Sequence, residues 1–207
     1  MRFSTIFGII VLVFALFGTV MVIGSDNMIG YDSDTWHDDY STDSLTSTPK
    51  VGDCYSYTEK VTYSANKDLN KRIEHKLLIK SAAGSTFEVS DSGTGEDFSL
   101  TAEEYKKYIV SESFIKVQGL TDKTSEKTTT LKTAFGKRNV YCDTYSLPDT
   151  EELHYQTYKI WYGEEGVLYK VLFEASYRYL SDEGYYSWGS TESLIKLTDC
   201  NFFVEES

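Results

Sequence analysis

Apolar and polar residues alternate along most of the chain after residue 50. The longest alternation follows the turn at 163–166. There, one face is wholly apolar or aromatic and consists of Val167, Tyr169, Val171, Phe173, Ala175, Tyr177 and Tyr179. A period of two places successive side chains on opposite faces of a strand, so it predicts a half-buried β-strand. Because the run is long for a flat strand, we expect it to bend or coil.

Weaker alternation predicts further strands along the domain. They cover about 55–63, 73–79, 87–89, 113–119, 126–135, 138–147, 153–162 and 190–204. Their connections are short, and a parallel crossover needs about a dozen residues or more, so neighbouring strands are expected to be antiparallel. The prediction is a mainly β fold: a curved antiparallel sheet forming a half-barrel or a barrel-like meander.

One short helix interrupts this pattern. Thr101 and Glu104 have the spacing of a capping box, and the residues that follow, up to Ile109, are compatible with about two helical turns. Glu103 and Glu104 in the first turn and two lysines in the last suit the helix dipole. We expect this helix to cover one end or one face of the sheet.

The beginning of the chain has no alternation. Residues 3–24 contain sixteen apolar residues and no charge, and as a helix they would measure about 33 Å, enough to cross a hydrocarbon core of roughly 30 Å. Arg2 precedes them and acidic residues follow, so the chain after residue 24 is expected on the extracytoplasmic side. The apolar segment is longer than the core of a typical signal sequence, so a retained single-pass anchor is favoured. A signal sequence cleaved near Ser25 is the alternative.

The rest of the chain divides into two parts. Residues 25–49 carry six aspartates and no basic residue, a composition typical of a disordered tether, and residues 50–207 form the β domain. The chain has 32 acidic and 20 basic residues, and one of the basic ones is Arg2. An acidic surface repels phosphate backbones, so nucleic acid is not expected as a partner.

Three cysteines lie far apart in the domain: Cys54, Cys142 and Cys200. In an extracytoplasmic chain they predict one disulfide and one remaining thiol. Cys54 and Cys200 would pair if the first and last strands were neighbours, and Cys142 is the rival partner.

Tyrosine is the compositional signature, with seventeen in the chain. Tyrosine suits half-buried strand positions, where the ring packs and the hydroxyl reaches water, so most tyrosines are expected to build the core. Some aromatics are also candidates for contacting a ligand on a concave face, namely Tyr169, Phe173, Tyr177, Tyr179 and Trp161.

No motif for catalysis, a cofactor or a metal is present, and none is predicted. His75 lies on the apolar face of its strand, where a hydrogen-bonded core histidine is the usual outcome. The loop at 91–97 holds three carboxylates, and a plain hairpin loop is favoured there over a weak cation site. Paired glutamates such as Glu151 and Glu152 are read as solvated charge.

Two runs carry a resemblance to a known group. These runs are residues 135–145 (FGKRNVYCDTY) and 158–170 (YKIWYGEEGVLYK). They contain a strand ending in Trp, a turn with glycine, and a following apolar strand. This rhythm resembles the central hairpins of exported lipoprotein-carrier (LolA-like) half-barrel proteins and of membrane-anchored surface proteins of archaea. The resemblance implies a concave apolar face that holds acyl chains.

The leading hypothesis is a non-enzymatic, membrane-anchored extracytoplasmic domain that binds a lipid, a glycan or an envelope protein on a concave aromatic face. A purely structural envelope protein is the first alternative. The second is a hydrolase that acts on envelope polymers through carboxylates.

Overall fold

The structure is a computed structural model and describes residues 48–181 and 184–201. Its strands are β1 (Cys54–Tyr63), β2 (Lys71–Ala83), β3 (Thr86–Asp91), β4 (Glu96–Thr101), β5 (Lys123–Thr133), β6 (Gly136–Ser146), β7 (Leu153–Tyr162), β8 (Leu168–Leu180) and β9 (Tyr186–Cys200). Its helices are α3 (Ala102–Lys106), α4 (Ser111–Gln118) and the short 3-10 helix η1 (Lys67–Leu69). The proposed anchor and nearly all of the proposed tether lie outside the described residues.

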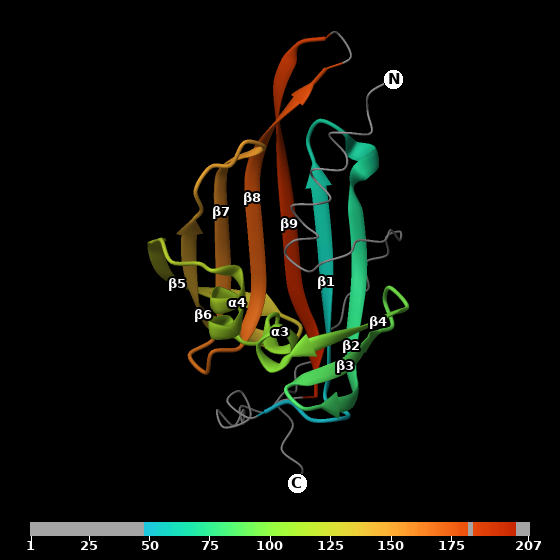
Figure 1. Cartoon of the computed structure of the whole chain (residues 1–207). Coiled ribbons are helices and arrows are strands. Elements are labelled where there is room, and N and C mark those ends of the chain that lie inside the picture. Colours follow the sequence, from blue (N-terminus) through green and yellow to red (C-terminus); the bar gives the residue numbers. More distant parts are fainter. Residues whose placement is uncertain (1–47, 182–183, 202–207) are drawn as a thin grey trace.

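All nine strands belong to one antiparallel sheet, in the order β4-β3-β2-β1-β9-β8-β7-β6-β5. The sheet is curved, and it is open because its two edge strands, β4 and β5, do not pair with each other (Figure 1). The expected mainly β, curved antiparallel architecture is therefore confirmed. No helix among the described residues is long and apolar enough to span a membrane.

The first and last strands are neighbours at the centre of the sheet, but no disulfide joins them. Cys200 lies directly opposite Tyr55, so both side chains occupy the same face. Cys54 precedes Tyr55 along β1 and points to the other face, because side chains alternate along a strand. Cys142 lies on β6, three strands from β9. The structure thus does not show the expected disulfide: all three cysteines are present as thiols.

Both α-helices lie over one face of the sheet, which we call the inner face (Figure 1). Helix α3 begins with the expected capping box, since the Thr101 amide donates to Glu104 Oε2 and the Glu104 amide to Thr101 Oγ1. The Tyr55 hydroxyl donates to the Tyr105 carbonyl at 2.8 Å, and the Tyr105 hydroxyl donates to the Asp53 carbonyl at 2.8 Å. These bonds fix α3 to β1.

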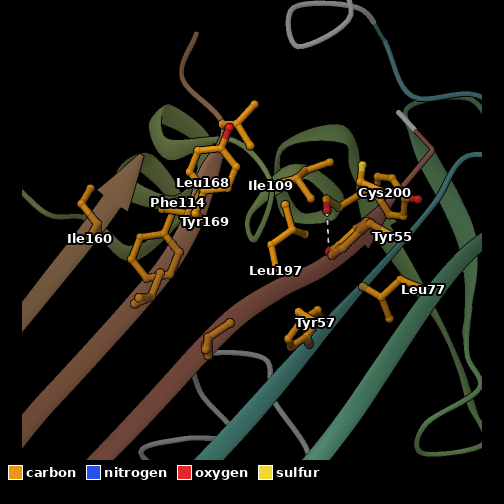
Figure 2. Close-up of a cluster of buried hydrophobic side chains, with 14 of the residues drawn as sticks. Tyr55, Tyr57, Leu77, Ile109, Phe114, Ile160, Leu168, Tyr169, Leu197 and Cys200 are labelled. Atoms are coloured by element: carbon orange, nitrogen blue, oxygen red, sulfur yellow. Dashed lines mark hydrogen bonds between the residues drawn. The ribbon is translucent and has the colours of Figure 1, made fainter. Parts of the chain in front are cut away.

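The main core lies between these helices and the sheet. Figure 2 shows Tyr55, Tyr57, Phe114, Leu197 and Cys200 among its members. The segment between the helices is also tied to the start of β8. The Leu168 amide donates to the Ile109 carbonyl, and the Ser111 amide donates to the Gly166 carbonyl, both at 3.0 Å. Burial of many aromatic side chains supplies the largest stabilising contribution to such a core.

One local prediction was wrong, and one strand was not predicted. Residues 113–119 were expected to be a strand because Ile115 and Val117 favour one, yet α4 occupies Ser111–Gln118. Phe114 is buried against the sheet there, and Gly119, at φ 64°, ends the helix in a left-handed cap. Strand β4 was not expected, because its sequence EDFSLT has only weak alternation.

The ends of β8 and β9 extend past their neighbours as a two-stranded ribbon (Figure 1). Pairing of β8 with β7 ends at Tyr177, and pairing of β9 with β1 ends at Thr191. The ribbon carries large side chains in solvent, since Tyr186 is 66% exposed and Trp188 is 58% exposed.

Candidate functional site

A cluster of polar side chains is buried in the apolar inner face. We call Glu59, His75, Asp91 and Ser193 the His75 cluster. They come from β1, β2, β3 and β9, respectively. His75 and Asp91 are each 3% exposed and Glu59 is 5% exposed. Burying ionisable groups is unfavourable unless they are paired. The contacts within the cluster must therefore compensate for the loss of solvent.

Asp91 and His75 form a buried, hydrogen-bonded pair. His75 Nδ1 lies 2.5 Å from Asp91 Oδ2, and Asp91 Oδ1 accepts hydrogen bonds from the amides of Lys76 at 3.1 Å and Gly93 at 2.9 Å. The turn after β3 has to approach β2 closely to supply these donors. A Cβ atom on Gly93 would lie 1.7 Å from the Glu74 carbonyl oxygen, so only glycine fits there.

These contacts shift the pKa values of both His75 and Asp91. Burial by itself would lower the pKa of His75, but the hydrogen bond to Asp91 and the charges of the Asp91 and Glu59 carboxylates outweigh it and raise this pKa to about 9. Burial would likewise raise the pKa of Asp91, yet the bonds from His75, Gly93 and Lys76 hold it below its ordinary value. At neutral pH the pair is therefore an imidazolium next to a carboxylate.

Glu59 is less well paired than Asp91. Its Oε1 accepts from the Ser193 hydroxyl at 3.2 Å, whereas its Oε2 has no hydrogen-bond partner. His75 Nε2 also lacks a hydrogen-bond partner, and it lies 3.7 Å from Glu59 Oε2, beyond normal hydrogen-bond distance. Two polar atoms shielded from solvent thus face each other with their hydrogen-bonding capacity unused.

Aromatic rings surround the cluster. The Tyr57 ring stacks on the His75 imidazole with centroids 4.5 Å apart and planes at 14°. Tyr108, in the segment between the helices, packs on Tyr57 at 4.6 Å. Burial, Tyr108 and the nearby Glu59 all raise the pKa of Tyr158, so its hydroxyl stays protonated at any physiological pH.

A strip of aromatic residues continues along the inner face from the cluster. This aromatic strip consists of Tyr63, Tyr158, Phe173, Tyr177 and Tyr179. Phe173 lies directly opposite Ser193, which connects the strip to Glu59. Tyr158 packs on Phe173 at 4.7 Å, and Tyr177 contacts Tyr63 at 6.2 Å and Tyr179 at 6.0 Å.

The aromatics proposed from the sequence as ligand contacts therefore separate into three groups. Phe173, Tyr177 and Tyr179 lie together in the aromatic strip. Tyr169 belongs to the main core, where its hydroxyl donates to Glu165 and its ring contacts Phe135. Trp161 lies opposite Lys170, on the outer face, and the Lys170 ammonium is 4.1 Å from its ring centroid.

A buried carboxylate outside the His75 cluster, Asp143, is paired with a cation. Its Oδ2 accepts from Lys123 at 3.0 Å and from the Tyr162 hydroxyl at 2.9 Å. The Lys123 ammonium, with Glu126 and Asp143 beside it, has a raised pKa and stays charged. Asp143 thus makes a direct hydrogen-bonded ion pair through Oδ2, whereas Glu59 lies 3.7 Å from its cationic neighbour His75; Asp143 Oδ1, like Glu59 Oε2, has no hydrogen-bond partner. No group of metal-binding side chains occurs among the described residues.

Sequence reasoning missed Glu59 and Asp91, although the signal was present. Glu59 falls between Tyr57 and Val61 on the apolar side of the alternation in β1, and Asp91 continues the series of Phe87 and Val89 in β3. A carboxylate at an inward-facing position of a half-buried strand predicts a buried partner. The expectation that His75 is a hydrogen-bonded core residue is confirmed at Nδ1.

Comparison with known proteins gives little further information. No protein-family model matches the chain, and no curated protein matches it. The chain is similar to a lipoprotein-sorting domain. This solved structure is an outer membrane lipoprotein-sorting protein domain from Vibrio parahaemolyticus, with 12% sequence identity over 75% of this chain and 88% of that chain and a TM-score of 0.20. This neighbour is from the same group of proteins that residues 135–145 and 158–170 resemble.

Proposed function

We propose that this chain is a non-enzymatic, membrane-anchored extracytoplasmic domain that binds a lipid along the aromatic strip of its inner face. The observation that carries the proposal is the pairing of this strip with two buried, unused polar atoms at one end. An apolar surface with a few convergent polar groups is the usual composition of a small-molecule site. In the described part of the chain, helices α3 and α4 rather than a second sheet cover part of the inner face.

The hydrolase alternative is less well supported. It needs a carboxylic acid with a raised pKa facing a second carboxylate. The pKa of Asp91 is instead lowered, and the carboxylate is held by three hydrogen bonds. Such a group is a poor proton donor near neutral pH.

Native mass spectrometry of the full chain, purified from its own host, tests the proposal. We expect one lipid to remain bound after the detergent is removed in the gas phase. Replacing Ala175, buried beside the strip on β8, with Phe should abolish this mass. The matched control is Ser176→Phe, whose side chain points to the opposite face and should leave the bound lipid in place.

A protein without bound lipid would overturn the lipid proposal and favour the purely structural alternative. Bound glycan instead of lipid would indicate the exposed ribbon as the binding surface, and loss of that glycan in Trp188→Ser would identify the contact.

The mass of the native chain separately tests the anchor, because a mature protein starting at Ser25 would show that the segment is a cleaved signal.

A further inference from the structure

The two unused polar atoms of the His75 cluster have complementary roles. Nδ1 of His75 is bonded to Asp91, and the imidazole is protonated at neutral pH, so Nε2 carries a hydrogen and is a donor without an acceptor. Glu59 Oε2, as a carboxylate oxygen, is an acceptor without a donor. The two groups attract each other as charges 3.7 Å apart, but burying both atoms without a hydrogen bond is unfavourable.

The distance between the two atoms restricts what can satisfy both. They are 3.7 Å apart, and a single oxygen atom can lie about 2.8 Å from each. That oxygen would accept from His75 Nε2 and donate to Glu59 Oε2. A hydroxyl group does both at one atom. An ammonium group cannot accept and would lie next to the imidazolium, whereas a carboxylate cannot donate and would lie next to Glu59.

We infer that the inner face recognises a lipid that carries a hydroxyl group, with that hydroxyl bridging His75 Nε2 and Glu59 Oε2. This inference rests on the proposed lipid-binding function and names its ligand class. The apolar part of the ligand would follow the aromatic strip, which begins beside the cluster at Phe173 and Tyr158. A buried site made to hydrogen-bond a hydroxyl discriminates strongly against analogues that lack one.

Access to the pair requires side chains to move, because both atoms are shielded from solvent. Tyr108, like Tyr158, is a partly exposed member of the rings packed around the cluster, and Lys107 Nζ lies 4.7 Å from the centroid of the Tyr108 ring. Movement of one partly exposed side chain is a common adjustment on binding.

Four ligands with the same chain test the inference on the unmodified full-length protein. They are dodecan-1-ol, its methyl ether, dodecanoic acid and dodecylamine, and their affinities are measured by displacement of a bound fluorescent anilinonaphthalene probe. We expect the alcohol to bind at least about tenfold more tightly than the ether, which accepts but cannot donate. The acid and the amine should also bind more weakly than the alcohol.

The outcomes separate the inference from the proposed function. Equal affinities for all four ligands would overturn the hydroxyl assignment, with a bridging water filling the pair, and would leave lipid binding standing. Tightest binding of the amine would likewise overturn it in favour of an ammonium ligand. Displacement by none of the four would overturn both proposals.

Variants of the cluster test which side chains produce the preference for the alcohol. Glu59→Leu should reduce the affinity for the alcohol to that for the ether, without changing the ether. His75→Gln provides a second measurement in case Glu59→Leu does not fold. It removes the donor from which the oxygen of either ligand accepts, so it should weaken binding of the alcohol and of the ether alike. Asp143→Asn, at a buried carboxylate outside the cluster, is the matched control and should keep the preference for the alcohol. A preference for the alcohol that persists in Glu59→Leu, or affinities that His75→Gln leaves unchanged, would contradict the assignment.

Discussion

His75 shows how a single side chain can tie stability to pH. Its imidazolium is favoured in the folded protein because Asp91 and Glu59 raise its pKa to about 9. The stabilisation is therefore complete below the ordinary histidine pKa of about 6.5 and is lost as the pH rises through about 9. Asp91 contributes with the opposite sign, since its lowered pKa gives stability that is lost in acid.

We expect the free energy of unfolding of the wild-type protein to fall by roughly 3 kcal/mol between pH 6.5 and pH 9, from a shift of this size at about 1.4 kcal/mol per pH unit. The variant His75→Gln has no titrating group there and should show a nearly flat profile over the same range. Urea denaturation at several pH values measures both. Parallel profiles for the two proteins would show that His75 does not control this dependence.

Gly93 gives a second prediction at the scale of the residue. Gly93→Ala would place a Cβ atom 1.7 Å from a backbone oxygen of β2, so the turn would move and Asp91 would lose the Gly93 amide. We expect a loss of at least about 3 kcal/mol. In the control Gly95→Ala, the added atom meets nothing within 4 Å and only the positive φ of 75° is strained, so about 1–2 kcal/mol is expected. Equal losses would show that the close approach is not limiting.

Among the elements, α3 is held by specific hydrogen bonds to β1 in addition to apolar contacts. Tyr55→Phe removes the buried bond to the Tyr105 carbonyl and keeps the ring in place. The expected cost is about 1 kcal/mol, measured by thermal or urea unfolding. Tyr186→Phe, at an exposed position, should change stability by less than about 0.5 kcal/mol. A neutral Tyr55→Phe would mean that packing alone positions the helix.

The elements also show what sequence reasoning can predict here. Alternation gave β1, β2, β7 and β8 because one face of each is buried, and the capping box gave α3 because it acts within a few residues. Helix α4 was missed because burial of Phe114 and the cap at Gly119 outweigh the strand preference of Ile115 and Val117. The His75 cluster was missed because it joins four strands, and only their register brings its members together.

For the whole molecule, an open sheet leaves two edges that could pair with other chains. β4 is short, with six residues, and β5 is longer but has exposed lysines along it. Charged side chains on an edge disfavour pairing between molecules. Lys127→Val with Lys132→Val should therefore produce self-association that depends on concentration, measured by sedimentation velocity. Lys60→Val on the central strand β1 is the control and should leave the sedimentation behaviour of the protein unchanged.

The central pairing of β1 with β9 has a consequence for how the chain acquires its structure. During synthesis, β1 to β4 can assemble early, but one edge of β1 stays unpaired until β9, the last of the described strands, has been made. Contacts between such distant segments close slowly, and an unpaired edge is prone to aggregation during the delay. Completion of the sheet is therefore expected to be the slow step of folding, and the incomplete chain the form that most needs a chaperone.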